Sequence, residues 1–150
     1  MKILVIEARF YEHISDMLLE GALDALAVHE DAEIFQVIVP GALEIPHVIS
    51  FAEAAGAGYD AYVALGCVIR GETTHYDYVC QESARAIMDL AVDKKLAIGN
   101  GIITVENEDQ AIARADKSKK DKGGFAARAA MTMVEIRNEL AQGEPQGDDT

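Results

Sequence analysis

Residues 64–78 decide the fold, and they read Ala-Leu-Gly-Cys-Val-Ile-Arg-Gly-Glu-Thr-Thr-His-Tyr-Asp-Tyr. An apolar run leads to Gly71, and Thr74 and His75 stand where a helical pattern begins. This order predicts a strand, a turn and a helix. In open α/β sheets, ligands bind beyond the carboxyl ends of the strands, where helix N-termini offer free N–H groups and partial positive charge. The stretch is therefore the first candidate for a phosphate site.

Strands and helices alternate on both sides of this stretch. Apolar runs predict strands at residues 2–8, 34–39, 61–69 and 96–105. Periodic apolar patterns predict helices at residues 14–28, 43–55, 74–94, 108–114 and 123–140. Ser15 or a residue just before it is expected to cap the first helix, and Pro46 suits the first turn of the second. The fold class is thus α/β, a three-layer sandwich around a four-stranded parallel sheet with right-handed crossovers.

Length and charge restrict the function classes. A chain of 150 residues, 50% of them apolar, can bury a real core, so we expect one domain at residues 1–142 and a disordered acidic tail at residues 143–150. The net charge of −13 argues against nucleic acid or an anionic membrane as the main partner. One short region is basic, and it is either a solvated loop or an anion site: Arg114, Lys117, Lys119, Lys120 and Lys122.

The N-terminus and the cysteines indicate a cytoplasmic protein. Charge interrupts the first apolar run too early for a signal peptide, and no apolar run approaches membrane-spanning length. Cys67 and Cys80 show neither Cys-x-x-Cys nor metal-ligand spacing. We expect both to be reduced, buried and structural. Gly99 and Gly101 in the fourth strand should leave room for a close approach to the backbone.

The expected strands all end in polar, aromatic or glycine-rich residues at one edge of the sheet. A pocket there would combine an aromatic platform at Phe10, a carboxylate at Glu44 and a histidine at His75 beside the N–H-rich turn. Each residue alone has a simpler interpretation, namely core packing for Phe10, the helix dipole for Glu44 and a surface or capping role for His75. The turn has neither Gly-x-Gly-x-x-Gly spacing nor a Walker lysine, so nothing supports a dinucleotide or ATP site.

Five motifs occur in a fixed order along the chain. They are Arg9-Phe10, residues 39–46 (Val-Pro-Gly-Ala-Leu-Glu-Ile-Pro), residues 65–79, residues 103–107 (Ile-Thr-Val-Glu-Asn) and Lys122-Gly123. In these motifs the chain resembles the 6,7-dimethyl-8-ribityllumazine synthase family, from about residue 3 to residue 137. The resemblance implies a flavodoxin-like sandwich and a transferase of riboflavin biosynthesis. Such an enzyme condenses 5-amino-6-(D-ribitylamino)uracil with 3,4-dihydroxy-2-butanone 4-phosphate and releases phosphate and water, with no metal or other cofactor.

The resemblance also implies a role for individual residues. Phe10 would stack on the pyrimidine ring, and His75 would be the general acid/base. Val68 and Ile69 would meet the uracil edge through backbone groups. The ribityl chain would contact Ala42, Leu43, Glu44 and Lys122. The phosphate would be bound by Gly71, Glu72, Thr73 and Arg114.

The family places its active site between neighbouring subunits of a pentameric ring, which implies that Asn100, Arg114 and Lys122 serve the adjacent chain. Pentamers, decamers and sixty-subunit shells all occur in the family. Repulsion among the four lysines of residues 116–124, unless phosphate or acidic neighbours compensate it, favours a pentamer here. Three positions depart from the family pattern. Asn100 replaces a common aromatic residue, the loop at residues 116–121 has no exact match for the family's loop lysine, and Phe125 stands where an acidic residue is common.

Two other functions remain open from the sequence. A non-catalytic flavin- or lumazine-binding protein, or a shell-forming one, could share the architecture, because a fold does not determine function. Phe10 and the departure at Asn100 favour this alternative. A flavodoxin-type FMN carrier is less well supported, because the phosphate turn follows the third strand and has no Trp/Tyr-flanked loop.

Overall fold

The computed structural model describes residues 1–143, so the predicted tail lies outside the described residues apart from Gly143. The strands are β1 (Lys2–Ala8), β2 (Glu33–Val39), β3 (Ala61–Ile69) and β4 (Ile98–Val105). The helices are α1 (Glu12–Leu26), η1 (a 3₁₀ helix, Ala42–Glu44), α2 (Ile45–Ala54), α3 (His75–Asp93), α4 (Glu108–Ala115) and α5 (Lys122–Ala141). The four strands are parallel and lie in the order β2-β1-β3-β4. The predicted α/β class is confirmed, and the arrangement is flavodoxin-like.

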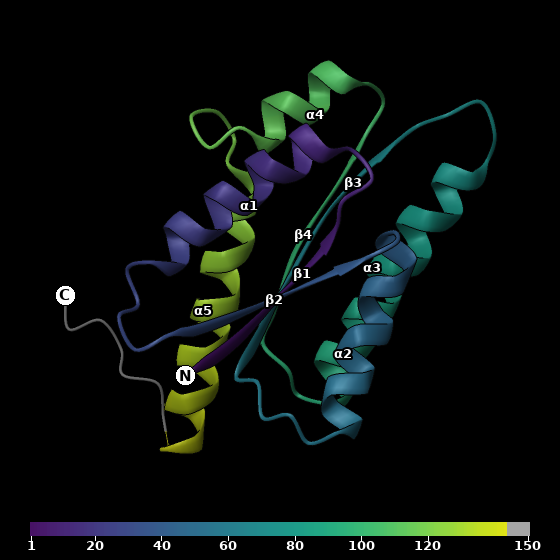
Figure 1. The fold of residues 1–150 in the computed structure, drawn as a ribbon. Coiled ribbons are helices and arrows are strands. Elements are labelled where there is room, and N and C mark those ends of the chain that lie inside the picture. The colour runs from purple at the N-terminus through teal and green to yellow at the C-terminus, as the bar shows by residue number, and fades with distance from the viewer. Residues whose placement is uncertain (144–150) are drawn as a thin grey trace.

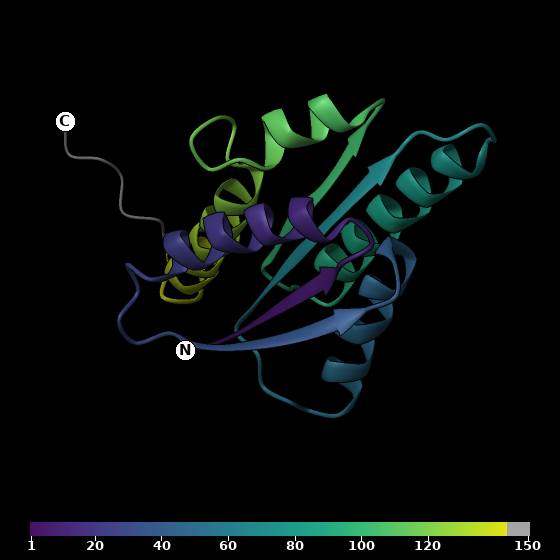
Figure 2. The ribbon, with the colours of Figure 1, turned by 45° about the horizontal axis from the view of Figure 1, so that its top comes forward.

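Helices cover both faces of the sheet. Figure 1 shows α1 and α5 on one side and α2 and α3 on the other, and the turned view in Figure 2 shows the same layers. The two faces of β1 explain this arrangement, because Ile3 and Val5 belong to the core beneath α1 and α5, whereas Leu4 and Ile6 belong to the core beneath α2. A central parallel strand that is buried on both faces has a continuous apolar sequence.

Two glycines let α5 approach β4 closely. A Cβ atom on Gly99 would collide with the backbone carbonyl of Ala126, and one on Gly101 would lie 3.0 Å from the Ala126 side chain. The room that the sequence predicted at these glycines is therefore filled by α5. Because neither glycine has a side chain, α5 packs closely against β4 at Ala126.

The start of α1 differs from the prediction. Ser15 lies inside the helix and is 4% exposed, so it is not a cap, and the N-cap residue, Tyr11, makes no side-chain capping hydrogen bond. The Ser15 hydroxyl has no hydrogen-bond partner in the described part of the chain. By contrast, Pro46 lies in the first turn of α2 as predicted.

Helix lengths bear on a membrane role as well. Within residues 1–143, none of the helices combines the length and the apolar character that crossing a membrane requires.

Candidate functional site

A pocket of about 410 Å³ opens at the carboxyl edge of the sheet, where the strand-end residues were expected to meet. The loop after β1, the segment that follows β2, the end of β3 and the start of α3 all contribute to its wall. The lining residues are Ala8, Phe10, Tyr11, Pro40, Gly41, Ala42, Leu43, Glu44, Cys67, Val68, Ile69, His75 and Val79. Among the predicted site residues, the pocket brings together Phe10, Ala42, Leu43, Glu44, Val68, Ile69 and His75.

Phe10 presents an open aromatic face to this pocket. Its side chain is 74% exposed, and its ring meets Tyr11 edge to face, with centroids 5.0 Å apart and planes 75° apart. A large apolar ring that remains exposed beside a pocket is suited to stacking on a planar ligand. Core packing, the simpler interpretation of Phe10, does not hold.

The segment after β2 shapes the opposite wall. Val39 is followed by Pro40 and Gly41, and the chain then turns through η1 into α2. Ala42 is buried, whereas Leu43 is 40% exposed and Glu44 is half-buried. The Glu44 carboxylate therefore remains accessible beside the pocket, where it can accept hydrogen bonds from hydroxyl groups.

The turn between β3 and α3 is anchored at its first residue. Arg70 donates its backbone N–H to the Val105 carbonyl at 2.9 Å, and its Nε atom donates to Glu106 at 2.7 Å. The Arg70 guanidinium also lies over the Tyr76 ring, 4.3 Å from its centroid. These contacts hold the turn at the end of β4.

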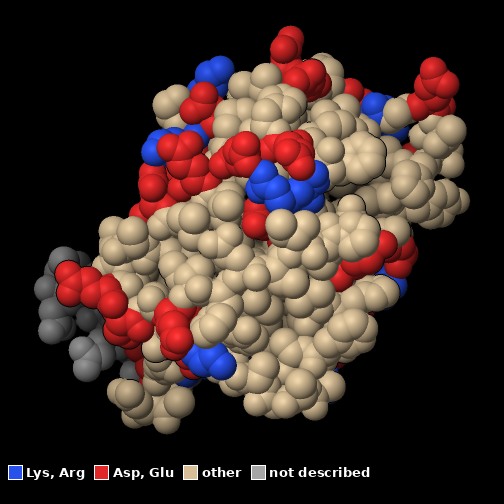
Figure 3. Space-filling view, in the orientation of Figure 1, with Lys and Arg blue, Asp and Glu red and all other residues tan. Residues whose placement is uncertain are grey.

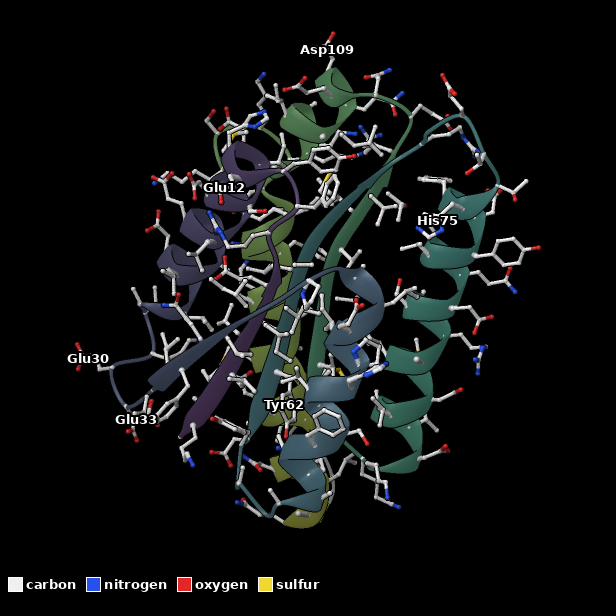
Figure 4. All side chains as sticks on the ribbon, turned by 45° about the vertical axis from the view of Figure 1, so that its right-hand side comes forward. Glu12, Glu30, Glu33, Tyr62, His75 and Asp109 are labelled. Atoms are coloured by element: carbon white, nitrogen blue, oxygen red, sulfur yellow. The ribbon has the colours of Figure 1, made fainter. Side chains whose placement is uncertain are left out.

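Beyond Arg70 the turn is open to solvent. Gly71, Glu72 and Thr73 are exposed and lie beside the pocket rather than in its wall. His75 occupies the first turn of α3, as Figure 4 shows, and its backbone N–H donates to the Thr73 hydroxyl at 3.3 Å. Helix N-termini attract anions, so this turn offers a phosphate a place next to the His75 side chain.

Three predicted site residues lie apart from the pocket in the described part of the chain. Asn100 lies on β4, and its side-chain oxygen accepts the Ile102 N–H at 3.0 Å. Arg114 donates to the Gln110 carbonyl at 3.1 Å within α4, and Lys122 begins α5. A single chain thus does not bring these side chains to the residues that line its own pocket.

The basic loop before α5 is tied to α1. Lys117 pairs with Glu20 at 2.8 Å and with Asp24 at 2.7 Å, and these two partners raise the pKa of the lysine. Acidic neighbours therefore compensate this lysine, which removes part of the repulsion expected within the loop. The Lys117 contacts favour the solvated-loop interpretation at this position.

Sequence reasoning did not assign six of the lining residues to the site: Ala8, Tyr11, Pro40, Gly41, Cys67 and Val79. Cys67 was expected to be only structural, and it is 8% exposed but lines the pocket. Burial raises the pKa of the Cys67 thiol to about 12, so the thiolate is scarce near neutral pH and the residue is a poor nucleophile. The sequence signal that could have placed Cys67 in the pocket was its position two residues before the end of β3. Cys80 is half-buried rather than buried as expected.

The shifted pKa of Cys67 predicts a change of stability in alkaline solution. The folded state keeps the proton up to about pH 12, whereas the unfolded thiol loses it from about 9.0 upward. The thiol therefore stabilises the fold fully below pH 9, and this contribution declines as the pH rises above that value. We expect the midpoint of urea unfolding to fall less steeply between about pH 9 and 11 in Cys67→Ala than in the wild type. Identical slopes in the two proteins would contradict this assignment.

Comparison with known proteins agrees with the geometry. The family model described as 6,7-dimethyl-8-ribityllumazine synthase matches residues 1–138. The chain belongs to this family. A Bartonella tribocorum protein named 6,7-dimethyl-8-ribityllumazine synthase is 59% identical over 135 residues, which cover 90% of this chain and 89% of the relative.

Other lumazine synthase relatives match over a similar length. A Rhizobium meliloti protein named 6,7-dimethyl-8-ribityllumazine synthase 1 is 57% identical over 145 residues, covering 92% of each chain. A Sphingopyxis alaskensis protein named 6,7-dimethyl-8-ribityllumazine synthase is 56% identical over 144 residues, covering 94% of this chain and 98% of the relative. The resemblance inferred from the motifs is confirmed, and the chain is a member of an enzyme family of riboflavin biosynthesis.

Proposed function

We propose that the pocket condenses 5-amino-6-(D-ribitylamino)uracil with 3,4-dihydroxy-2-butanone 4-phosphate to form 6,7-dimethyl-8-ribityllumazine, releasing phosphate and water. One observation carries this proposal: an exposed aromatic ring, an accessible carboxylate and a histidine line a single pocket in a chain of this family. A binding protein without catalysis would not need the histidine beside the phosphate turn.

The pyrimidine substrate is assigned to the half of the pocket near Phe10. The exposed ring of Phe10 stacks on the pyrimidine, and the backbone of Val68 and Ile69 at the end of β3 meets the uracil edge. The ribityl chain extends along Ala42 and Leu43, where Glu44 accepts hydrogen bonds from its hydroxyl groups.

The ketone phosphate is assigned to the turn before α3. Gly71, Glu72 and Thr73 bind the phosphate in the positive field of the helix N-terminus. His75, the first residue of α3, lies beside this turn and carries protons between the reacting groups. Amine addition to the ketone, loss of water and elimination of phosphate each need a proton transfer near neutral pH, which a histidine supplies.

Holding the two substrates together accounts for much of the rate enhancement over the spontaneous condensation. The amine and the ketone react slowly when free, and a pocket that aligns them converts a bimolecular step into one within a complex. The turn before α3 stabilises the negative charge of the phosphate as it leaves. Phe10 holds the pyrimidine substrate in position.

We further propose that the site is completed by a second chain in a pentameric ring. Arg114, Lys122 and Asn100 lie away from their own pocket, which suits residues that contribute to the neighbour's site. Large apolar side chains are exposed, including Ile38 at 65% and Phe51 at 67%. Figure 3 shows a broad face with few charged side chains, the kind of surface that is buried in an assembly.

A mixing experiment tests the shared site. His75→Ala and Arg114→Ala should each be nearly inactive alone, and rings reassembled from equal amounts should regain about one quarter of wild-type activity, because random mixing pairs an intact His75 with an intact neighbouring Arg114 in that share of sites. If both residues act within one chain, no mixture regains activity. The reference mixture combines His75→Ala with Lys94→Ala, a change at an exposed residue at the end of α3. It measures how far activity falls when active chains are simply diluted by inactive ones.

The proposed reaction itself is tested by product formation. Purified protein mixed with both substrates should produce lumazine absorbance faster than the spontaneous condensation does. Tight binding of riboflavin or of ribityllumazine without synthesis would instead indicate the non-catalytic alternative.

A further inference from the structure

Phe10 has little packing of its own to fix the direction of its ring. The side chain is 74% exposed, and the only aromatic ring in the described chain that it contacts is that of its neighbour Tyr11. The orientation of Phe10 must therefore come from the backbone of the short connection between β1 and α1. Whatever holds that connection also sets the angle of the stacking face.

A side-chain cap at the start of α1, which would commonly fix such a connection, is absent from the described residues. The N-cap residue of α1, Tyr11, accepts no hydrogen bond through its side chain from the first backbone N–H groups of the helix, although Ser, Thr, Asp or Asn commonly does so at this position. The residue next to Phe10 on its other side, Arg9, makes the contacts that join the two elements instead.

Arg9 links β1 to α1 through its two guanidinium nitrogens. Nη1 donates to the Glu7 carboxylate at 2.6 Å, two residues back along β1. Nη2 donates to the Asp16 carboxylate in the second turn of α1 and lies 3.4 Å from the Glu12 carbonyl oxygen. Glu12 marks the first turn of α1 in Figure 4. One side chain thus spans the whole connection that carries Phe10.

The Glu7 end of this link is fixed. Glu7 is 3% exposed, and a buried carboxylate is held strongly to its partner because separating the pair would leave a charge without water. The Arg9 side chain is only 16% exposed, whereas that of Asp16 is 71% exposed. The buried pair therefore anchors the guanidinium to the sheet, and its second nitrogen holds the start of the helix.

We propose that Arg9 is a positioning residue that aims Phe10 at the pyrimidine ring of the substrate. This inference rests on the proposed function and adds a determinant of substrate affinity outside the pocket wall. The planar fork of arginine bonds two acceptors in fixed directions, whereas the single ammonium of lysine can stay with Glu7 but cannot also span to α1. Arg9→Lys therefore keeps the buried charge paired and removes only the link.

The test compares steady-state constants for the two substrates. Arg9→Lys should raise the KM for the ribitylaminouracil by about three- to tenfold, the size of one weakened aromatic contact, and leave the KM for the ketone phosphate and kcat within about twofold. Asp16→Asn, which touches only the exposed end of the link, should raise the same KM by a smaller factor. The matched control is Arg85→Lys on α3, which also removes an arginine bridging two carboxylates, Glu82 and Asp89, and should change neither KM.

A fluorescence titration with 6,7-dimethyl-8-ribityllumazine gives a readout that does not need turnover. Weaker binding by Arg9→Lys and Asp16→Asn supports the positioning role even if the wild type shows no synthesis, a result that would contradict only the proposed reaction. Wild-type binding and wild-type KM in folded Arg9→Lys would overturn the inference, and so would an equal loss for both substrates. If Arg9→Lys does not fold, the test rests on Asp16→Asn. An unchanged KM for the ribitylaminouracil in that variant overturns the inference.

Discussion

Replacing His75 by alanine should lower kcat by about 10²-fold or more, the usual cost of removing a general acid/base. The residue lies in the pocket wall at the first turn of α3, next to the turn assigned to phosphate. Alanine is compatible with that helical position, and His75 is exposed, so the fold should be unchanged. Stopped-flow measurement of lumazine absorbance with both substrates saturating isolates the chemical step from binding.

The control for His75 is His29→Ala. His29 follows α1 at the opposite edge of the sheet and lines no part of the pocket formed by the described residues. This variant should keep the wild-type kcat. A near-wild-type rate in His75→Ala would show that solvent or the substrate itself carries the protons, and the site would then act through positioning alone.

Gly99→Ala should destabilise the protein by about 2 kcal/mol or more, toward the upper end of overpacking changes. The new Cβ would meet the backbone carbonyl of Ala126, which cannot rotate away as a side chain can. Either α5 moves off β4 or the strand distorts. Urea unfolding followed by circular dichroism at a fixed protein concentration measures the loss, since assembly makes stability depend on concentration.

The matched control is Gly66→Ala on the neighbouring strand β3. A Cβ there would lie 3.4 Å from the nearest atom, the Ala8 Cβ, which is ordinary van der Waals contact. This variant should differ from the wild type by less than about 1 kcal/mol. Equal stability losses in the two variants would contradict the close approach of α5 to β4.

The sequence predicts the fold well because the strands are continuous apolar runs. The expected third strand, residues 61–69, coincides with β3 at both ends, since charged or glycine-rich segments bound it. The predicted cap of α1 was wrong because the helix begins at Glu12, three residues before Ser15, and its N-cap residue, Tyr11, makes no side-chain capping bond. Arg9 reaches from β1 into the second turn of α1, and nothing in the local sequence at Ser15 reveals that link.

The candidate site was predictable only in part. His75, Phe10 and Glu44 stood out because they directly follow strands whose ends meet at one edge, a rule of parallel sheets. Cys67 lines the pocket from inside β3, and whether a strand residue faces a pocket or the core depends on packing around it. Arg114 and Lys122 were expected in the site through resemblance, but neither lines the pocket of its own chain. Their role in the site of a neighbouring chain is a prediction that the mixing experiment tests.

We expect this chain to make lumazine from the two substrates in the pocket between β1, β3 and α3. The most direct test follows lumazine absorbance and phosphate release in one reaction, with heat-denatured protein as the reference for spontaneous condensation. We predict one phosphate per lumazine, at a rate proportional to protein concentration and reduced by about 10²-fold or more in His75→Ala. A rate equal to that of the reference would contradict the claim.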